Sequence, residues 1–89
     1  MSVFDDYSAK ILVELLDHGE ANSFSELIRR TDINDRTLNI RLVELSRAGL
    51  ISDTPTPGFP PRRKIRLTKK GKRVAELFKE ILRVLNGQV

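Results

Sequence analysis

The chain has 89 residues, 16 Lys/Arg against 12 Asp/Glu, a net charge of +4, one histidine and no cysteine. This length suits one small domain with a compact core. The missing cysteine excludes disulfides and thiolate metal sites, and a single histidine without a second clustered base leaves no nucleophile triad. We therefore expect no enzyme, no metal site and no cofactor.

The charges are distributed unevenly along the chain. Residues 1–52 hold six Lys/Arg and nine Asp/Glu, a balance of −3, whereas residues 53–89 hold ten and three, a balance of +7. A segregated basic end is typical of a surface that meets a polyanion, which is either a nucleic acid or a membrane. No apolar run is long enough to cross a bilayer, and the N-terminus is unlike a secretory signal. We expect a cytoplasmic, nucleoid-associated protein.

The first predicted helix covers residues 5–19. Asp5 and Asp6 mark its start, and Gly19 marks its end. Its spacing places five side chains on one buried face, namely Tyr7, Ile11, Leu12, Leu15 and Leu16.

A second, short helix is predicted at residues 24–30. Ser23 and Glu26 fit a capping box at its start, and Leu27 and Ile28 point inward.

The third predicted helix covers residues 35–48, with Asn34 as its cap and Gly49 as its stop. Its buried stripe is Leu38, Leu42 and Leu45. The opposite face carries Arg36, Ile40 and Arg47, flanked by polar residues.

Two short strands are predicted next, at residues 50–52 and 63–68. They are separated by a segment that contains all four prolines of the chain, so they form a hairpin with a stiff loop. Thr68 then caps a last helix at residues 69–87, whose apolar row is Val74, Leu77, Phe78, Ile81, Leu82 and Leu85.

Three segments in this order resemble the winged helix-turn-helix transcriptional regulators of the HxlR, MarR and PadR-like group. They are "FSEL" at 24–27, "RTLNIRLVELSRAGLI" at 36–51 and "LTKKGK" at 67–72. The resemblance implies a mainly α fold with a small β-hairpin and an additional C-terminal helix, in a single domain over 1–89. It also implies that the third helix enters the major groove of double-stranded DNA and that the hairpin, the wing, lies on the backbone or minor groove.

The wing and its approach carry the strongest basic signal. Residues 62–73 contain eight Lys/Arg and no acid, and Arg62, Arg63 and Lys64 follow the prolines directly, so they are the predicted phosphate contacts. The competing interpretation is a solvated strand edge that Lys and Arg protect from aggregation.

Base and phosphate contacts are predicted on the two preceding helices. The candidates on the third helix are Arg36, Thr37, Asn39, Ile40 and Arg41. Ser23 and Ser25 are candidates for a phosphate contact, although Ser23 equally suits a cap. The alternative is a plain solvent-facing helix, since Asp35 and Glu44 nearly cancel its arginines.

Phe59 and His18 have less specific roles. Phe59 lies at the predicted loop tip, where it either folds back onto the domain or wedges against DNA or a partner. His18 lies at the end of the first helix, where the helix dipole favours a cation, and we expect a structural or surface role.

The last helix is predicted to dimerise. Its apolar face is too wide for one contact, so one part covers the core and the rest, Val74, Phe78, Ile81, Leu82 and Leu85, meets a second copy. The basic residues precede this helix and do not line its polar face, which favours a protein partner over a membrane.

Two other functions remain open at this point. One is a winged-helix module for protein–protein interaction, and the other is an architectural DNA binder with little sequence preference. The sequence does not identify a small-molecule effector, an operator, or an activating or repressing role.

Overall fold

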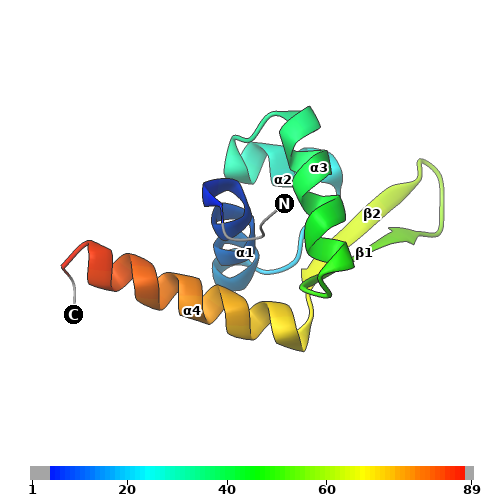
Figure 1. Ribbon diagram of the computed structural model, residues 1–89. Coiled ribbons are helices and arrows are strands. Elements are labelled where there is room, and N and C mark those ends of the chain that lie inside the picture. The colour runs from blue at the N-terminus through cyan, green and yellow to red at the C-terminus, as the bar shows by residue number, and fades with distance from the viewer. Residues whose placement is uncertain (1–4, 88–89) are drawn as a thin grey trace.

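The computed structural model describes residues 5–87 and confirms the predicted fold class. Figure 1 shows four helices and one hairpin, in the order α1 (Asp6–His18), α2 (Phe24–Thr31), α3 (Asp35–Arg47), β1 (Ile51–Thr56), β2 (Arg62–Leu67) and α4 (Lys69–Leu85). The predicted domain covers 1–89, and the segment predicted to dimerise runs from the start of the last helix to the end of the domain, 69–89. Residues 1–4 and 88–89 of these ranges lie outside the described part.

Each helix begins at the cap that the sequence predicts. A side-chain oxygen accepts a hydrogen bond from a backbone N–H three residues later at Asp5, Ser23, Asn34 and Thr68. The capping box of α2 differs in one detail, because the Glu26 carboxylate accepts from the N–H of Asn22 (3.3 Å) and not from that of Ser23.

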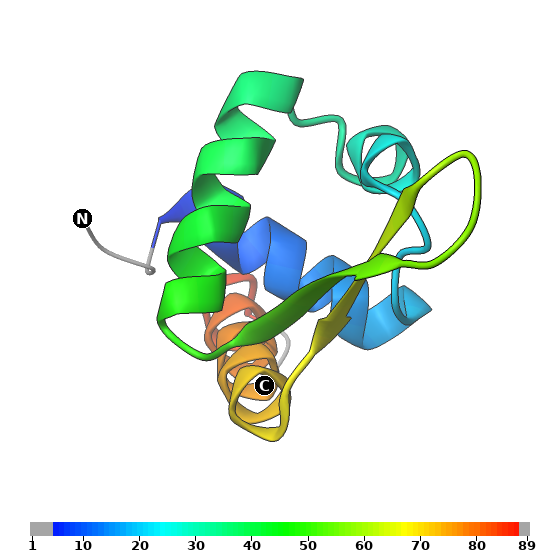
Figure 2. The ribbon, with the colours of Figure 1, turned by 90° about the vertical axis from the view of Figure 1, so that its right-hand side faces the viewer.

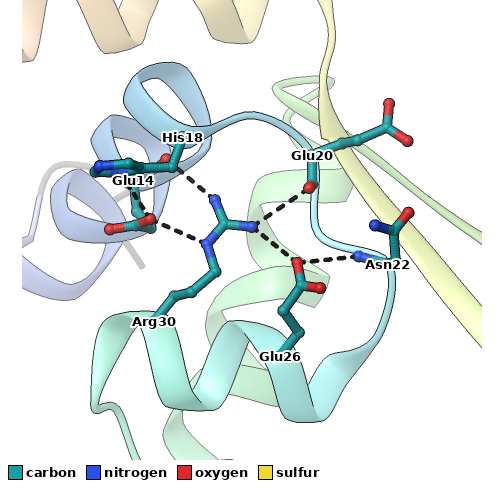
Figure 3. Close-up of a pocket in the computed structure, with 6 residues that line it drawn as sticks. All are labelled: Glu14, His18, Glu20, Asn22, Glu26 and Arg30. Carbon is teal, nitrogen blue, oxygen red and sulfur yellow. Dashed lines mark hydrogen bonds and ion pairs between the residues drawn. The ribbon is translucent and has the colours of Figure 1, made fainter.

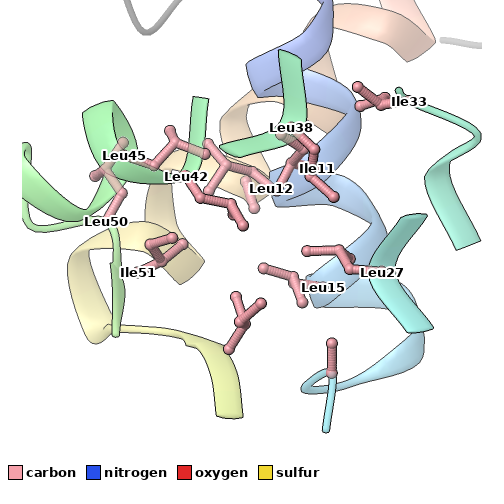
Figure 4. Packing of buried hydrophobic residues seen from close by; sticks show 13 residues of the cluster. Ile11, Leu12, Leu15, Leu27, Ile33, Leu38, Leu42, Leu45, Leu50 and Ile51 are labelled. Atoms are coloured by element: carbon pink, nitrogen blue, oxygen red, sulfur yellow. The ribbon is translucent and has the colours of Figure 1, made fainter. Parts of the chain in front are cut away.

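The core lies between α1, α2, α3 and the hairpin (Figure 4). The α3 stripe of Leu38, Leu42 and Leu45 is completely buried, as predicted. The prediction that Tyr7 is buried is wrong, since 45% of it is exposed and Ser8 is buried in its place. The inward positions of α1 are Ser8, Ile11, Leu12 and Leu15, which follow the spacing of one helical face and leave Tyr7 at its margin.

The hairpin is longer than the sequence predicts. β1 continues to Thr56, and its antiparallel register runs from Ile51 opposite Leu67 to Thr56 opposite Arg62. Pro55 was expected to keep its segment out of the strand. In a two-stranded sheet, however, each strand has one unpaired edge, where a residue without an N–H is tolerated.

A second segment fixes the middle of the hairpin. Ala21, in the link between α1 and α2, exchanges two backbone hydrogen bonds with Ile65 of β2, at 2.8 and 2.9 Å. Ile65 is itself completely buried. The inner half of the hairpin is therefore held by both backbone and side chain.

α4 begins against the turn that follows α3. The Thr68 hydroxyl donates to the carbonyl of Gly49 (2.6 Å), and a Cβ placed on Gly71 would lie 1.7 Å from the Leu50 carbonyl oxygen. Only glycine allows this close approach of the two backbones. The helix then packs along α1 and extends beyond it, on the side away from the wing (Figures 1 and 2).

Candidate nucleic-acid interface

The outward face of α3 presents side chains that are able to contact base edges. Arg36, Asn39 and Ile40 are exposed, and Thr37 is half-buried beside them. Asn34 fixes the start of this face, because its Oδ1 accepts from the N–H of Thr37 at 2.9 Å. Within residues 5–87 the Arg36 guanidinium forms no ion pair, so it is available to an external acceptor.

α3 and the wing meet at an open pocket of about 250 Å³, which is lined by Phe24, Asp35, Arg36, Asn39 and Arg63. Three of these residues were predicted as DNA contacts. Phe24 and Asp35 were not, because the sequence gives no sign that the first turn of α2 lies against β2. This pocket brings the candidate base-reading and phosphate-binding groups to one surface.

Arg41, predicted as a DNA contact, has internal partners in the structure. Its guanidinium forms ion pairs with Asp5 (2.7 Å) and Glu44 (3.2 Å) and lies over the ring of Tyr7. Only 19% of its side chain is exposed. Arg41 therefore connects α3 to the start of α1, and Tyr7 has its role there and not in the core.

The pKa of the Asp5 carboxylate is lowered by its surroundings, including Arg41. Burial acts to raise its pKa, but the hydrogen bonds from Ser8 and the charge of Arg41 outweigh burial and hold the pKa below the ordinary value of 3.8. Asp5 is therefore ionised at neutral pH and supports both the cap of α1 and the position of α3.

The three basic residues after the prolines have different environments. Arg62 is exposed, and no acid within the described residues pairs with it. Arg63 forms a two-bonded pair with Asp53 of β1 (3.1 and 2.5 Å) and stacks on Phe24, with 4.8 Å to the ring centroid. Lys64 pairs with Glu20 at 3.2 Å.

These pairs correct the view that the basic run lacks compensating acids. Asp53 and Glu20 lie outside the run in sequence, but the hairpin brings them against it. Arg62 is therefore the most accessible of the three predicted wing contacts, whereas Arg63 and Lys64 would have to exchange an internal partner for a phosphate.

The two serines at the start of α2 have different environments. The Ser23 hydroxyl oxygen accepts from the Glu26 N–H at 3.0 Å, so it has a capping role. Ser25 is exposed on the first turn of α2. Of the two, Ser25 has the hydroxyl that is available to a phosphate.

A second cavity, of about 480 Å³, lies between α1 and α2 (Figure 3). It is lined by Glu14, His18, Glu20, Asn22, Glu26 and Arg30. Arg30 uses all five of its N–H groups here: it donates to the carboxylates of Glu14 and Glu26 and to the carbonyls of Glu14, Gly19 and Glu20. His18 pairs with Glu14 at 2.9 Å. This group of residues ties α1 to α2 and has no excess of positive charge for DNA.

The apolar face of α4 divides into a covered part and an exposed part, as predicted. Val74 and Phe78 are half-buried and pack against the core, and with Leu77 and Ile81 they also line an apolar pocket. Ile81, Leu82 and Leu85 are 53, 44 and 75% exposed. In the described part of the chain, no helix combines the length and apolar character that crossing a membrane requires.

This arrangement of three helices, a β-hairpin and a following helix is that of a winged helix-turn-helix domain. The model of the HxlR-like helix-turn-helix family matches residues 3–88, nearly the whole chain. The chain belongs to this family, so it is a transcriptional regulator of the HxlR/MarR winged-helix type, a class that binds DNA. A search of the curated proteins finds no match.

Solved structures show the same fold. The protein ytfH from Salmonella typhimurium has a TM-score of 0.81 and 26% identity, and the match covers 94% of this chain and 74% of that one. A transcriptional regulator homologue from Pyrococcus horikoshii OT3 has a TM-score of 0.74 and 26% identity, with coverages of 88% and 78%. Diamide-treated YodB from B. subtilis has a TM-score of 0.76 and 22% identity, with coverages of 90% and 78%.

Proposed function

We propose that this protein is a sequence-specific regulator that binds double-stranded DNA with α3 in the major groove and the wing on the adjacent backbone. The observation that carries the proposal is the exposed face of α3 beside the projecting hairpin, with hydrogen-bonding groups of both at one pocket. α4 lies on the other side of the domain, so it leaves this surface open (Figures 1 and 2).

The side chains of this face match the chemistry of base edges. Arg36 can donate two hydrogen bonds to guanine O6 and N7, Asn39 can pair with adenine N6 and N7, and Ile40 can contact a thymine methyl group. Thr37 lies at the first turn of α3, where backbone N–H groups and the helix dipole favour a phosphate.

The wing would supply affinity and little sequence preference. Arg62 is exposed and forms no ion pair within the described chain, and Ser25 is exposed on the first turn of α2. Both would contact the phosphate backbone of the DNA. Phosphate contacts fix the position of a protein on the duplex but do not read its sequence. Arg63 and Lys64 each have N–H groups left over from their pairs with Asp53 and Glu20, but the neighbouring carboxylates weaken their attraction for a phosphate.

Selection of bound duplexes from a random pool tests this proposal. Wild-type protein should enrich a defined site, and Arg36→Ala should relax the preference at one base pair by about 1–3 kcal/mol while the fold is retained. Arg29→Ala is the matched control, because Arg29 is an exposed arginine on α2 outside the proposed contacts. Binding without preference would support the architectural alternative, and no binding at low salt would support the protein-interaction module.

We further propose that two copies associate through α4. A large exposed apolar row in a small domain usually marks an interface, and Ile81, Leu82 and Leu85 form such a row. A two-fold dimer would place two α3 helices about 34 Å apart, one turn of DNA, and would favour a near-palindromic site.

Sedimentation tests the dimer separately from DNA binding. Wild type at micromolar concentration should sediment as a dimer, and the double variant Ile81→Asp, Leu85→Asp should sediment as a monomer with weaker DNA binding. Arg83→Glu changes the charge of the same helix outside the apolar row and should leave the dimer intact. A wild-type monomer would exclude this assembly.

A further inference from the structure

The tip of the wing carries a large apolar side chain with no cover. Phe59 is 97% exposed, more than any other large hydrophobic residue of the described chain. Of the two alternatives for Phe59, the one in which it folds back onto the domain is therefore wrong. A phenylalanine that stays in water adds no burial to the stability of the fold, so its side chain is free to contact an external surface.

The hairpin delivers this side chain on a stiff support. Its middle is fixed by the Ala21–Ile65 backbone pair, and nearer the loop Arg63, opposite Pro55, stacks on Phe24. Beyond β1, residues 57–61 form a short loop in which Pro57, Pro60 and Pro61 restrict the backbone. Little conformational entropy is then lost when the tip is immobilised against a partner.

The charges around the tip favour a polyanionic partner. Arg62 follows the loop directly and is exposed, whereas the exposed Arg66 lies further along β2, opposite Ser52. No acid lies between residues 54 and 75. An apolar side chain close to an exposed cation suits the minor groove, where phosphates line both sides and the base stack lies between them.

We propose that Phe59 is a wedge that inserts between two base pairs from the minor groove and partly unstacks them. This inference rests on the proposed DNA-binding function and adds a specificity determinant to it. Apolar wedges of this kind kink the duplex toward the major groove. Pyrimidine–purine steps such as TA and CA/TG open most easily, so the wedge would select such a step without a hydrogen bond to any base.

The test repeats the selection from random duplexes with wild type, Phe59→Ala and Phe59→Leu. Wild type should enrich a pyrimidine–purine step beside the positions that depend on Arg36. Phe59→Ala should lose this step and bind the selected duplex roughly tenfold more weakly, given the usual value of aromatic–base stacking. Phe59→Leu should retain the step preference, because leucine also acts as a wedge.

Two further readouts separate a wedge from a simple loss of affinity. 2-Aminopurine placed at the selected step should become more fluorescent with wild type and Phe59→Leu, but not with Phe59→Ala. Arg62→Ala is the matched control: it should lower the salt dependence of binding and keep the step preference, whereas Phe59→Ala should keep the salt dependence. The thermal unfolding of Phe59→Ala should equal that of wild type, since the side chain is exposed.

The outcomes distinguish the two proposals. If wild type selects no duplex, the proposed function fails and the wedge fails with it. If wild type selects a site but Phe59→Ala has the same affinity and the same step profile, only the wedge is overturned. Self-association that depends on Phe59 and occurs without DNA would also overturn it, in favour of a protein partner for the tip.

Discussion

The two ends of the hairpin differ in their contacts with the rest of the domain: the base is packed against it, and the tip is not. At the base, Ile65 is buried and bonded to Ala21, and Thr68 and Gly71 lie against the turn at 49–50. At the tip, Phe59 has no contact that covers it. The base therefore contributes to the stability of the fold, whereas the tip contributes only if something outside the domain contacts it.

Arg62 and Arg63 show the same contrast between a residue with internal contacts and one without them. Arg63 is bound to Asp53 and stacked on Phe24, and Arg62 has no ion-pair partner in the described chain. Arg62 and Arg63 are adjacent on β2, and successive side chains of a strand point to opposite faces, so the face of the strand decides whether an arginine holds the domain together or remains available. Substitutions should accordingly separate into those that affect stability and those that affect DNA binding.

The largest expected effect is that of Gly71→Ala at the base. Its new Cβ would overlap the Leu50 carbonyl oxygen, which is backbone and cannot rotate away, so the start of α4 must shift. We expect a loss of about 3 kcal/mol or more in the free energy of unfolding, measured by urea denaturation. Gly49→Ala is the control: nothing lies within 4 Å of its Cβ, so only its positive φ of 78° opposes alanine, at about 1 kcal/mol. Equal losses in the two variants would contradict the proposed close approach.

A smaller decrease in the free energy of unfolding is expected from Thr68→Val. The Thr68 hydroxyl donates to the Gly49 carbonyl and accepts from the Gly71 N–H at 3.0 Å, and valine keeps the shape but removes both bonds. The free energy of unfolding should fall by about 1–2 kcal/mol. Thr68→Ser retains the hydroxyl and should lose less. If serine and valine are equally destabilising, packing and not the cap is the main contribution of Thr68.

The Asp5–Arg41 ion pair, which anchors α3, should make the free energy of unfolding depend on pH. The folded-state pKa of Asp5 lies below 3.8, so its stabilisation is present above about pH 4 and is lost as the pH falls through the lowered pKa. Asp5→Asn keeps a cap but removes the charge beside Arg41. It should be less stable than wild type by about 0.5–1 kcal/mol at neutral pH, and the difference should vanish in acid. Thermal unfolding across this pH range measures it, and a difference that persists in acid would assign the effect to the cap alone.

Local signals in the sequence were sufficient to predict the elements of the fold. The four caps have side chains whose preference for that position has a direct cause, and the leucine stripe of α3 follows the helical period. The length of β1 was underestimated because the tolerance of a strand for Pro55 depends on whether its edge is paired. That is a property of the sheet, which the local sequence does not contain.

The candidate site was less predictable, because ionic partners are chosen by the fold. Arg41 and Arg36 lie five positions apart on one helix, yet one is held by Asp5 and the other is exposed. Asp53 and Glu20 reach Arg63 and Lys64 only after the hairpin has formed and docked. A count of charges along the chain indicated the correct surface but not which residues on it remain available.

The smallest effect on the free energy of unfolding is expected from Arg62→Ala. Its comparison with Arg63→Ala tests the contrast between the two arginines directly. Arg62 is exposed, so its loss should change the free energy of unfolding by no more than about 0.5 kcal/mol. If it contacts one phosphate, the slope of log affinity against log salt should become shallower by about 0.9 for any duplex. Arg63→Ala removes the partner of Asp53 and the stack on Phe24, so it should destabilise the fold by about 1 kcal/mol and change the slope less. Unfolding curves and salt titrations of the two variants measure both quantities. A larger slope change for Arg63→Ala would mean that Arg63, although paired with Asp53, is the stronger phosphate contact of the two.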